Sequence, residues 1–292
     1  MSLGLVFVPL VAALGFAVVI GLTARVQFPS SAARFGVALT MAVVVAYVPS
    51  VVLLALGYLA HLPMLGSGVR WCTQAFGLHA AVPAVVGLPA IALVGAGLWG
   101  VVRLVRTTRR LRALSHDTSG VVQHGDPFAV VLPGHQGTVV VSSALVEMLD
   151  EREQAVVMAH ERSHALHRHD RYLLAAELSA AVLPLLRPLA DRVRLAVERW
   201  ADEDAARVVG DREFVARTLG KVALQSRGAP RGALAFGGGQ VVQRVSALLA
   251  AAPLPPRGHV RAWMWLGGIV ATGLALVQVH HLEHLVAALC PH

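Results

Sequence analysis

The chain has 292 residues, of which 56% are hydrophobic and only 14% are charged, and its mean hydropathy is +0.64. Soluble domains carry about 25% charged residues, so this composition excludes an ordinary soluble protein and predicts a membrane protein. The formal net charge of +8 comes from arginine, because Lys221 is the only lysine. Aromatic residues do not alternate with the basic ones, which argues against direct binding of nucleic acid.

Four uncharged stretches approach or exceed the roughly 20 apolar residues that a membrane-spanning helix needs. They are residues 3–22, 35–60, 80–102 and 262–279. The first stretch has no basic residues before it and is too long for a signal peptide, so we interpret it as a retained anchor.

These stretches predict a mostly α membrane protein with four transmembrane helices. We expect a three-helix membrane region (1–102), an α+β cytoplasmic domain (103–261), and a fourth helix with a short extracytoplasmic tail (262–292).

Three arginine-rich segments flank the predicted spans, and all three are expected on a single side of the membrane. Basic residues collect on the cytoplasmic side, so the N- and C-termini are expected outside in a multi-pass cell-membrane protein. The loop between the second and third spans has only Arg70. The flanking arginines are Arg25, Arg34, Arg103, Arg106, Arg109, Arg110, Arg112, Arg257 and Arg261.

Cys72 and Cys290 are the only cysteines, and this topology places both on the outer side. Because that compartment permits disulfides, we hypothesise a bridge between them; the alternative is two small buried apolar residues. Two such cysteines cannot form a CxxC zinc site, so any metal site must use histidine and carboxylate ligands.

The polar segment begins with two β-branched runs, PFAVVLP (127–133) and TVVVS (138–142). The glycines between them predict two strands joined by a turn, and TVVVS is a candidate for pairing with an extended substrate. Ser142 or Ser143 is expected to cap a short helix over 144–149. Asp150, with Glu153 three residues later, predicts a capping box at the start of the next helix.

The run AHERSHALHRHD, residues 159–170, holds four histidines. On a helix His160 and His164 share one face, with Cβ atoms about 5–6 Å apart, so both imidazoles can bind one zinc ion. Glu161 is rotated off that line, where it can reach a metal-bound water rather than bind the ion. This is the HExxH pattern. A solvated helix face rich in histidine would also match it, and His167 and His169 are interpreted as solvated or supporting residues.

A second helix, VRLAVERWADEDAARVVG (193–210), carries Glu198 and Asp202 four residues apart. Glu198 can complete a His–His–Glu triad, and Asp202 can accept a hydrogen bond from the outer nitrogen of a ligating histidine. The alternatives are an exposed acidic face on this helix and Glu177 as the third ligand. If residues 172–190 crossed the bilayer, Glu198 and His160 would lie on opposite sides, so this apolar stretch is expected to turn back.

These runs resemble the membrane zinc metallopeptidases of the BlaR/MecR type, gluzincins with HExxH and ExxxD motifs. The resemblance rests on LPGHQGTVVVSSALVEML, HERSHALHRHD and ERWAD, and it covers roughly residues 103–225. It implies one Zn²⁺ per chain held by His160, His164 and Glu198, with Glu161 as the catalytic residue and Asp202 as its ExxxD partner.

The resemblance also implies peptide-bond hydrolysis, with a cytosolic transcriptional repressor as substrate and possible self-cleavage. The chain departs from the antibiotic sensors of that type: only residues 280–292 follow the last predicted span, and the SxxK acylation motif is absent. Direct β-lactam sensing is therefore not expected. The alternatives are an HtpX-like membrane quality-control protease and a non-catalytic zinc-holding signalling scaffold. A homodimer is left open.

Overall fold

The computed structural model describes residues 28–59, 82–114, 120–127, 129–131, 139–225 and 240–253, together with the single residues 15, 62, 266, 269 and 273. The first and fourth predicted spans lie outside these ranges except for those single residues. Cys72 and Cys290 also lie outside them, so the bridge stays a prediction. The described part is mostly helical.

Two long helices coincide with the second and third predicted spans: α2 (Pro29–Leu59) and α4 (Ala84–Leu114). Both are long and apolar enough to cross a membrane. The helix α4 continues past residue 102 into the arginine-rich segment, because RLVRTTRRLRAL contains no glycine or proline to end it. The domain boundary expected between residues 102 and 103 thus falls inside one continuous helix.

A small sheet follows, with strand order β1 (Gly120–Val122), β3 (Val139–Ser142), β2 (Ala129–Val131). The predicted antiparallel pair is confirmed: β2 pairs with β3 so that Val130 faces Val140. Strand β1 pairs with β3 in parallel and was not predicted, because three residues give little periodic signal. Since β3 has a neighbour on each side, the prediction that TVVVS accepts a substrate strand is wrong.

The next two helices begin where the sequence predicts. The Ser142 side chain caps α5 (Ser143–Met148) by accepting a hydrogen bond from the Leu145 backbone at 3.2 Å. Asp150 and Glu153 form the expected capping box at the start of α6 (Glu151–His167), with bonds of 2.7 and 3.0 Å. These caps fix the start of the helix that carries HExxH, and hence the direction in which its histidines point.

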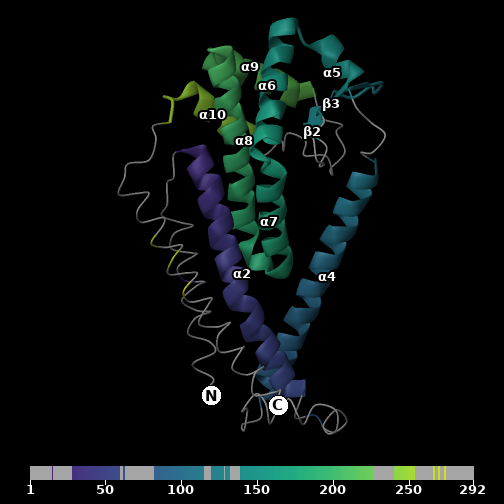
Figure 1. Ribbon diagram of the computed structural model, residues 1–292, viewed down its shortest axis with the longest axis vertical. Helices are drawn as coiled ribbons and strands as arrows, with labels where there is room; N and C mark the ends of the chain where they lie inside the picture. Colours follow the sequence, from purple (N-terminus) through teal and green to yellow (C-terminus); the bar gives the residue numbers. More distant parts are fainter. Residues whose placement is uncertain are drawn as a thin grey trace, which may run out of the picture.

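A helical hairpin follows α6, and its second helix carries Glu198 and Asp202. Arg168 has a φ of 53°, in the left-handed region, and this single residue separates α6 from α7 (His169–Val182). A 3₁₀ turn at Pro184–Leu186 reverses the chain into α8 (Arg187–Val209). The hairpin packs against α2 and α4 (Figure 1), so the prediction that residues 172–190 turn back is confirmed.

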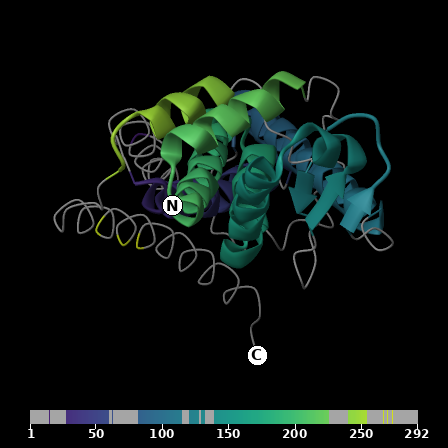
Figure 2. The same cartoon turned by 90° about the horizontal axis from the view of Figure 1, so that it is seen from above.

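Two further helices complete the end of the molecule that contains α6: α9 (Arg212–Gln225) and α10 (Val241–Leu249). Val156 of α6, Ala205 of α8, Val215 of α9 and Leu248 of α10 share one buried cluster. Seen from above, the strands lie on one side of α6 and α10 lies on the other (Figure 2). The core therefore fixes α6, α8 and α10 against one another.

Candidate active site

The first two residues of the HExxH motif are buried on α6, and His164 is partly buried. His160 is 2% exposed and Glu161 is 5% exposed. The Nε2 atoms of His160 and His164 face each other at 3.1 Å. Two imidazole nitrogens aimed at one point, one helical turn apart, match the geometry that the i, i+4 spacing predicts.

Glu198 reaches the same point from α8. One carboxylate oxygen lies 3.6 Å from Nε2 of His160 and the other lies 3.8 Å from Nε2 of His164. Ligands about 2.0–2.1 Å from a tetrahedral zinc ion stand about 3.3 Å apart. The three donors, all within 4.8 Å of one another, therefore fit a single ion with little movement of the helices.

Asp202 lies one turn further along α8, on the outer side of His160. Its carboxylate is 3.1 Å from Nδ1 of His160, and its side chain is almost wholly buried. A carboxylate in this position fixes the tautomer in which Nδ1 carries the proton and Nε2 offers its lone pair. The structure thus brings together all five motif residues: His160, Glu161, His164, Glu198 and Asp202.

Arg244 of α10 completes the site, and the sequence analysis did not identify it. Its guanidinium donates to both oxygens of Asp202, at 2.8 and 2.6 Å, and lies 2.9 Å from Glu198. The residue is 2% exposed. A signal was present: Arg244 lies four residues before Leu248, on the buried stripe of α10, where an arginine needs a buried carboxylate partner.

His169 is fully buried, which excludes the solvated alternative and leaves the interpretation as a supporting residue. Its Nδ1 lies 3.0 Å from Nδ1 of His164. Burial lowers the pKa of His169 to about 2 and that of His164 to about 4, so both rings are neutral. One of the two facing nitrogens must therefore carry the hydrogen and the other must accept it.

Burial and neighbouring charges together shift the pKa values of His160, Glu161 and Glu198. Burial would lower the pKa of His160, but Asp202 and Glu198 outweigh it and raise that pKa to about 9. Burial raises the pKa of Glu161 to about 7. Burial also favours the neutral form of Glu198, yet Arg244 and His160 hold its pKa well below the usual range. A metal ion must therefore displace a proton from His160.

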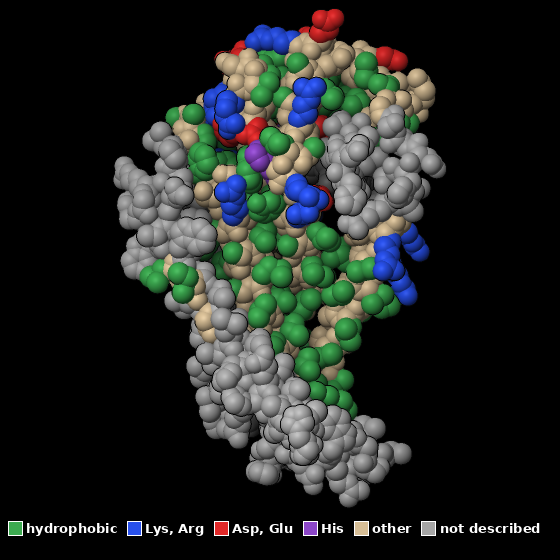
Figure 3. Space-filling view, in the orientation of Figure 1, with side chains coloured by type: hydrophobic (Ala, Val, Ile, Leu, Met, Phe, Trp, Pro, Cys, Tyr) green, Lys and Arg blue, Asp and Glu red, His purple; other side chains and the backbone are tan. Residues whose placement is uncertain are grey.

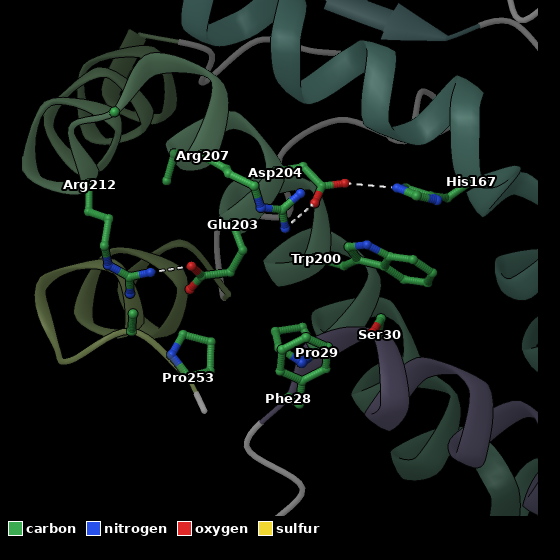
Figure 4. Close-up of a pocket in the computed structure, with 13 residues that line it drawn as sticks. Phe28, Pro29, Ser30, His167, Trp200, Glu203, Asp204, Arg207, Arg212 and Pro253 are labelled. Atoms are coloured by element: carbon green, nitrogen blue, oxygen red, sulfur yellow. Dashed lines mark hydrogen bonds and ion pairs between the residues drawn. The ribbon is translucent and has the colours of Figure 1, made fainter. Parts of the chain in front are cut away.

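His167 faces away from this site, into a separate cavity of about 670 Å³ on the other side of α8 (Figure 4). Its Nε2 lies 2.9 Å from Asp204, which also accepts a hydrogen bond from Ser163 at 2.7 Å. Glu177, the rival third ligand, pairs instead with Arg187 at 2.9 Å and with Arg194. Neither His167 nor Glu177 belongs to the cluster of candidate metal ligands.

Comparison with known proteins identifies the family to which the chain belongs. Residues 107–190 match peptidase family M48. The chain is also 30% identical over 200 residues to a Halobacterium salinarum protein named "Protease HtpX homolog", an alignment that covers 50% of this chain and 69% of that relative. The chain belongs to peptidase family M48. No protein of solved structure matches it.

As an M48 peptidase, the protein is a metallopeptidase. The prediction that it belongs to a family of membrane zinc metallopeptidases is therefore confirmed. The family match runs from the end of α4, through the sheet and α6, to the start of α8, and it ends before Glu198. The matching relative carries the name of the HtpX-like alternative.

Proposed function

We propose that this M48 peptidase is a membrane-anchored endopeptidase that holds one Zn²⁺ per chain through His160, His164 and Glu198. The observation that carries the proposal is the position of the Glu198 carboxylate, 3.6 and 3.8 Å from the two Nε2 atoms. Two imidazoles and one carboxylate are a typical donor set of catalytic zinc, which keeps its fourth position open.

Bound zinc supplies a Lewis acid that polarises the scissile carbonyl and lowers the pKa of water to about 7. Glu161 takes the proton from the attacking water and delivers it to the leaving amine. In the metal-free site burial raises the pKa of this carboxylate to about 7, and the positive charge of bound zinc would favour the ionised form that accepts the proton. Asp202 holds His160 in its ligating tautomer, and Arg244 holds Asp202 and Glu198 in place.

The free edge of β2 is the proposed docking strand for substrate. Among the described strands β2 has a neighbour on one side only. Ala129 of β2 packs with Val157 of α6, which lies one turn before His160. A peptide that adds to this edge as a further strand gains backbone hydrogen bonds and passes beside the metal ligands.

The proposed topology places the catalytic helices on the cytoplasmic side of the membrane, with α2 and α4 crossing it. Arg103, Arg106, Arg109 and Arg110 are exposed and follow directly on the apolar part of α4, as expected for a cytoplasmic flank. The N- and C-termini then lie outside, and segments 1–102, 103–261 and 262–292 act as the membrane region, the protease domain and the last span with its tail.

We propose a regulatory role for the peptidase, with a cytosolic transcriptional repressor as substrate and self-cleavage as a second reaction. A quality-control role is the second candidate, and the name of the HtpX homologue favours it. The two roles differ in substrate range: a regulator cleaves one or two proteins, whereas a quality-control protease cleaves many damaged membrane proteins.

Proteomic comparison of cells that express wild type with cells that express Glu161→Gln tests the proposal. We expect fragments that only wild type produces: a single cytosolic repressor fragment for the regulatory role, or fragments of many membrane proteins for quality control. Glu213→Gln, which removes a carboxylate from an exposed ion pair, is the matched control and should leave the wild-type pattern unchanged. Identical fragments from wild type and Glu161→Gln would exclude Glu161 as the base.

A further inference from the structure

The tip of the α7–α8 hairpin, residues 178–186 (LSAAVLPLL), contains no charged side chain. We propose that this hairpin tip enters the hydrocarbon region of the bilayer beside α2 and α4, so that its partner is lipid and not water. The inference rests on α2 and α4 as membrane spans and is independent of the proposed catalytic roles.

The helix α4 gives a first measure of depth. Its apolar part begins at Ala84 and ends at Arg103, the first charged residue, and 19 residues of helix span about 28 Å, close to the hydrocarbon thickness of about 30 Å. A Cβ at Gly97 would lie 3.3 Å from the backbone oxygen of Val182, and one at Gly100 would collide with that of Ala181. These contacts lie about 4.5–9 Å below Arg103, on the membrane side.

The helix α2 gives a second, independent measure. Arg34 is its only charged residue, and it is followed by an uncharged, mostly apolar run to the end of the helix. The Ser179 hydroxyl lies 3.5 Å from the sulfur of Met41, about 10 Å along the helix beyond Arg34. Leu183 and Leu186 share a buried cluster with Val43 and Tyr47, which lie deeper still on α2. Along both helices the hairpin tip therefore lies on the membrane side of the nearest charged residue, which is Arg34 in α2 and Arg103 in α4.

The charges nearest the hairpin tip stand directly above it. Glu177 pairs with Arg187 and Arg194, and neighbouring opposite charges reduce the cost of lying near lipid. An arginine at this level can also extend its long side chain toward the headgroups. Seen from the side, hydrophobic side chains cover the lower part of the described molecule, whereas acidic and most basic side chains gather above (Figure 3).

Leu185 is the residue that the proposal explains best. It is 76% exposed at the turn of the hairpin, where a soluble protein gains nothing from a large apolar side chain. On α4, Leu98 and Trp99 are also largely exposed, as expected for side chains that face acyl chains. From Arg187 to Glu198 the helix α8 rises about 16 Å, so a tip held in lipid fixes the height of the metal ligand above the membrane.

Depth-dependent quenching of a fluorophore at position 185 tests the proposal. The chain, with Cys72→Ser and Cys290→Ser, receives a single cysteine by Leu185→Cys, Leu98→Cys or Leu166→Cys and carries an environment-sensitive dye. It is then reconstituted in vesicles of phosphatidylcholine and phosphatidylglycerol. Leu166 is the matched control, because it is 77% exposed at the end of α6. Leu98 is the control for a lipid-facing position.

We expect nitroxides on the acyl chains to quench the dye at 185 and 98 strongly, and aqueous iodide to quench it at 166 alone. Iodide quenching at 185 as strong as at 166, or quenching at 185 by headgroup nitroxides only, would overturn the proposal. Iodide quenching at 98 would show that α4 does not span and would overturn it through that premise.

A second pair of variants keeps the native cysteines. Leu185→Glu places a charge at the hairpin tip, and we expect it to lower the thermal unfolding midpoint in vesicles by several degrees. Leu166→Glu places the same charge at a site exposed to water and should leave the midpoint unchanged. Equal midpoints for the two variants would contradict a lipid environment at residue 185.

Discussion

Arg244 donates two hydrogen bonds to the Asp202 carboxylate, at 2.8 and 2.6 Å, and that carboxylate lies 3.1 Å from Nδ1 of His160. One buried acid therefore connects α10 to the HExxH helix. Arg244 also lies 2.9 Å from Glu198, so a single guanidinium compensates two carboxylates that are withdrawn from water. The orientation of the proposed zinc ligands therefore depends on α10, which contributes none of the three.

Arg244→Met is expected to destabilise the fold and to weaken zinc binding. It leaves Asp202 and Glu198 without their buried counter-charge, which lowers the free energy of unfolding by about 3–5 kcal/mol. Loss of support behind a ligating histidine weakens metal affinity by about 10–100-fold. Denaturant unfolding and chelator competition measure the two effects. Arg217→Met, which breaks an exposed ion pair, should change stability by less than about 1 kcal/mol; equal effects of the two variants would contradict this role of Arg244.

His169→Leu is expected to weaken zinc binding by about 10–100-fold. The Nδ1 atom of His169 lies 3.0 Å from Nδ1 of His164, and as an acceptor it holds the ligating tautomer of that histidine. His169→Asn retains an acceptor at similar reach and should recover most of the affinity. His167→Leu is the matched control, since His167 bonds to Asp204 outside the site. A His169→Leu protein with wild-type zinc affinity would show that His164 needs no such support.

The rate of hydrolysis is expected to rise with pH through an acid limb that belongs to Glu161. Burial raises its pKa from 4.5 to about 7, and only the ionised carboxylate can accept the proton of water. Below the limb, each pH unit therefore lowers kcat/KM about tenfold. The positive charge of bound zinc favours the ionised form, which places the limb between the ordinary value and about 7. A pH–rate profile at saturating zinc measures it; a rate that is level from pH 4 to 8 would exclude this assignment.

Zinc binding has a pH dependence of its own, because His160 also holds a proton. The zinc affinity must therefore be measured at each pH as the control for the pH–rate profile. In the metal-free site its pKa is about 9, so zinc must displace this proton at neutral pH. Affinity is therefore expected to rise with pH until about 9 and then to level off. Saturation with zinc at each pH separates this effect from the ionisation of Glu161.

Gly100→Ala is expected to disturb the packing of α4 on the α7–α8 hairpin. Its new methyl group would collide with the backbone oxygen of Ala181, and backbone atoms cannot move aside cheaply. Gly95→Ala, five residues earlier on the same helix, meets nothing within 4 Å and should be neutral or stabilising by up to about 1 kcal/mol, since alanine favours helix. Thermal unfolding in detergent compares them, and equal midpoints would contradict the close approach of the two segments.

The parts of the site that follow a local spacing rule were predictable from sequence. The i, i+4 pairs His160/His164 and Glu198/Asp202 share helix faces, and the capping box at Asp150 fixes where α6 begins. The reversal of the chain within residues 172–190 was also predictable, because only a hairpin brings Glu198 to the same side of the membrane as His160. Each inference used either one helix or one geometric requirement between two helices.

The partners that residues meet through tertiary contacts were not predictable. Arg244 lies 42 residues after Asp202, and no spacing rule connects positions so far apart. The burial of His169 depends on the left-handed turn at Arg168, which the sequence does not mark with glycine. The place of β3 between two strands depends on β1, whose three residues carry no clear pattern. The error over the substrate strand followed from that omission.

Zinc content and peptide hydrolysis, measured together on wild type, Glu161→Gln and Glu198→Gln, test the central claim most directly. The two variants make the same chemical change on two different helices of the site, α6 and α8. We expect one zinc per chain and hydrolysis from wild type, one zinc but a rate at least about 100-fold lower from Glu161→Gln, and loss of both from Glu198→Gln. A Glu198→Gln protein that retains one tightly bound zinc ion and cleaves at the wild-type rate would contradict the account.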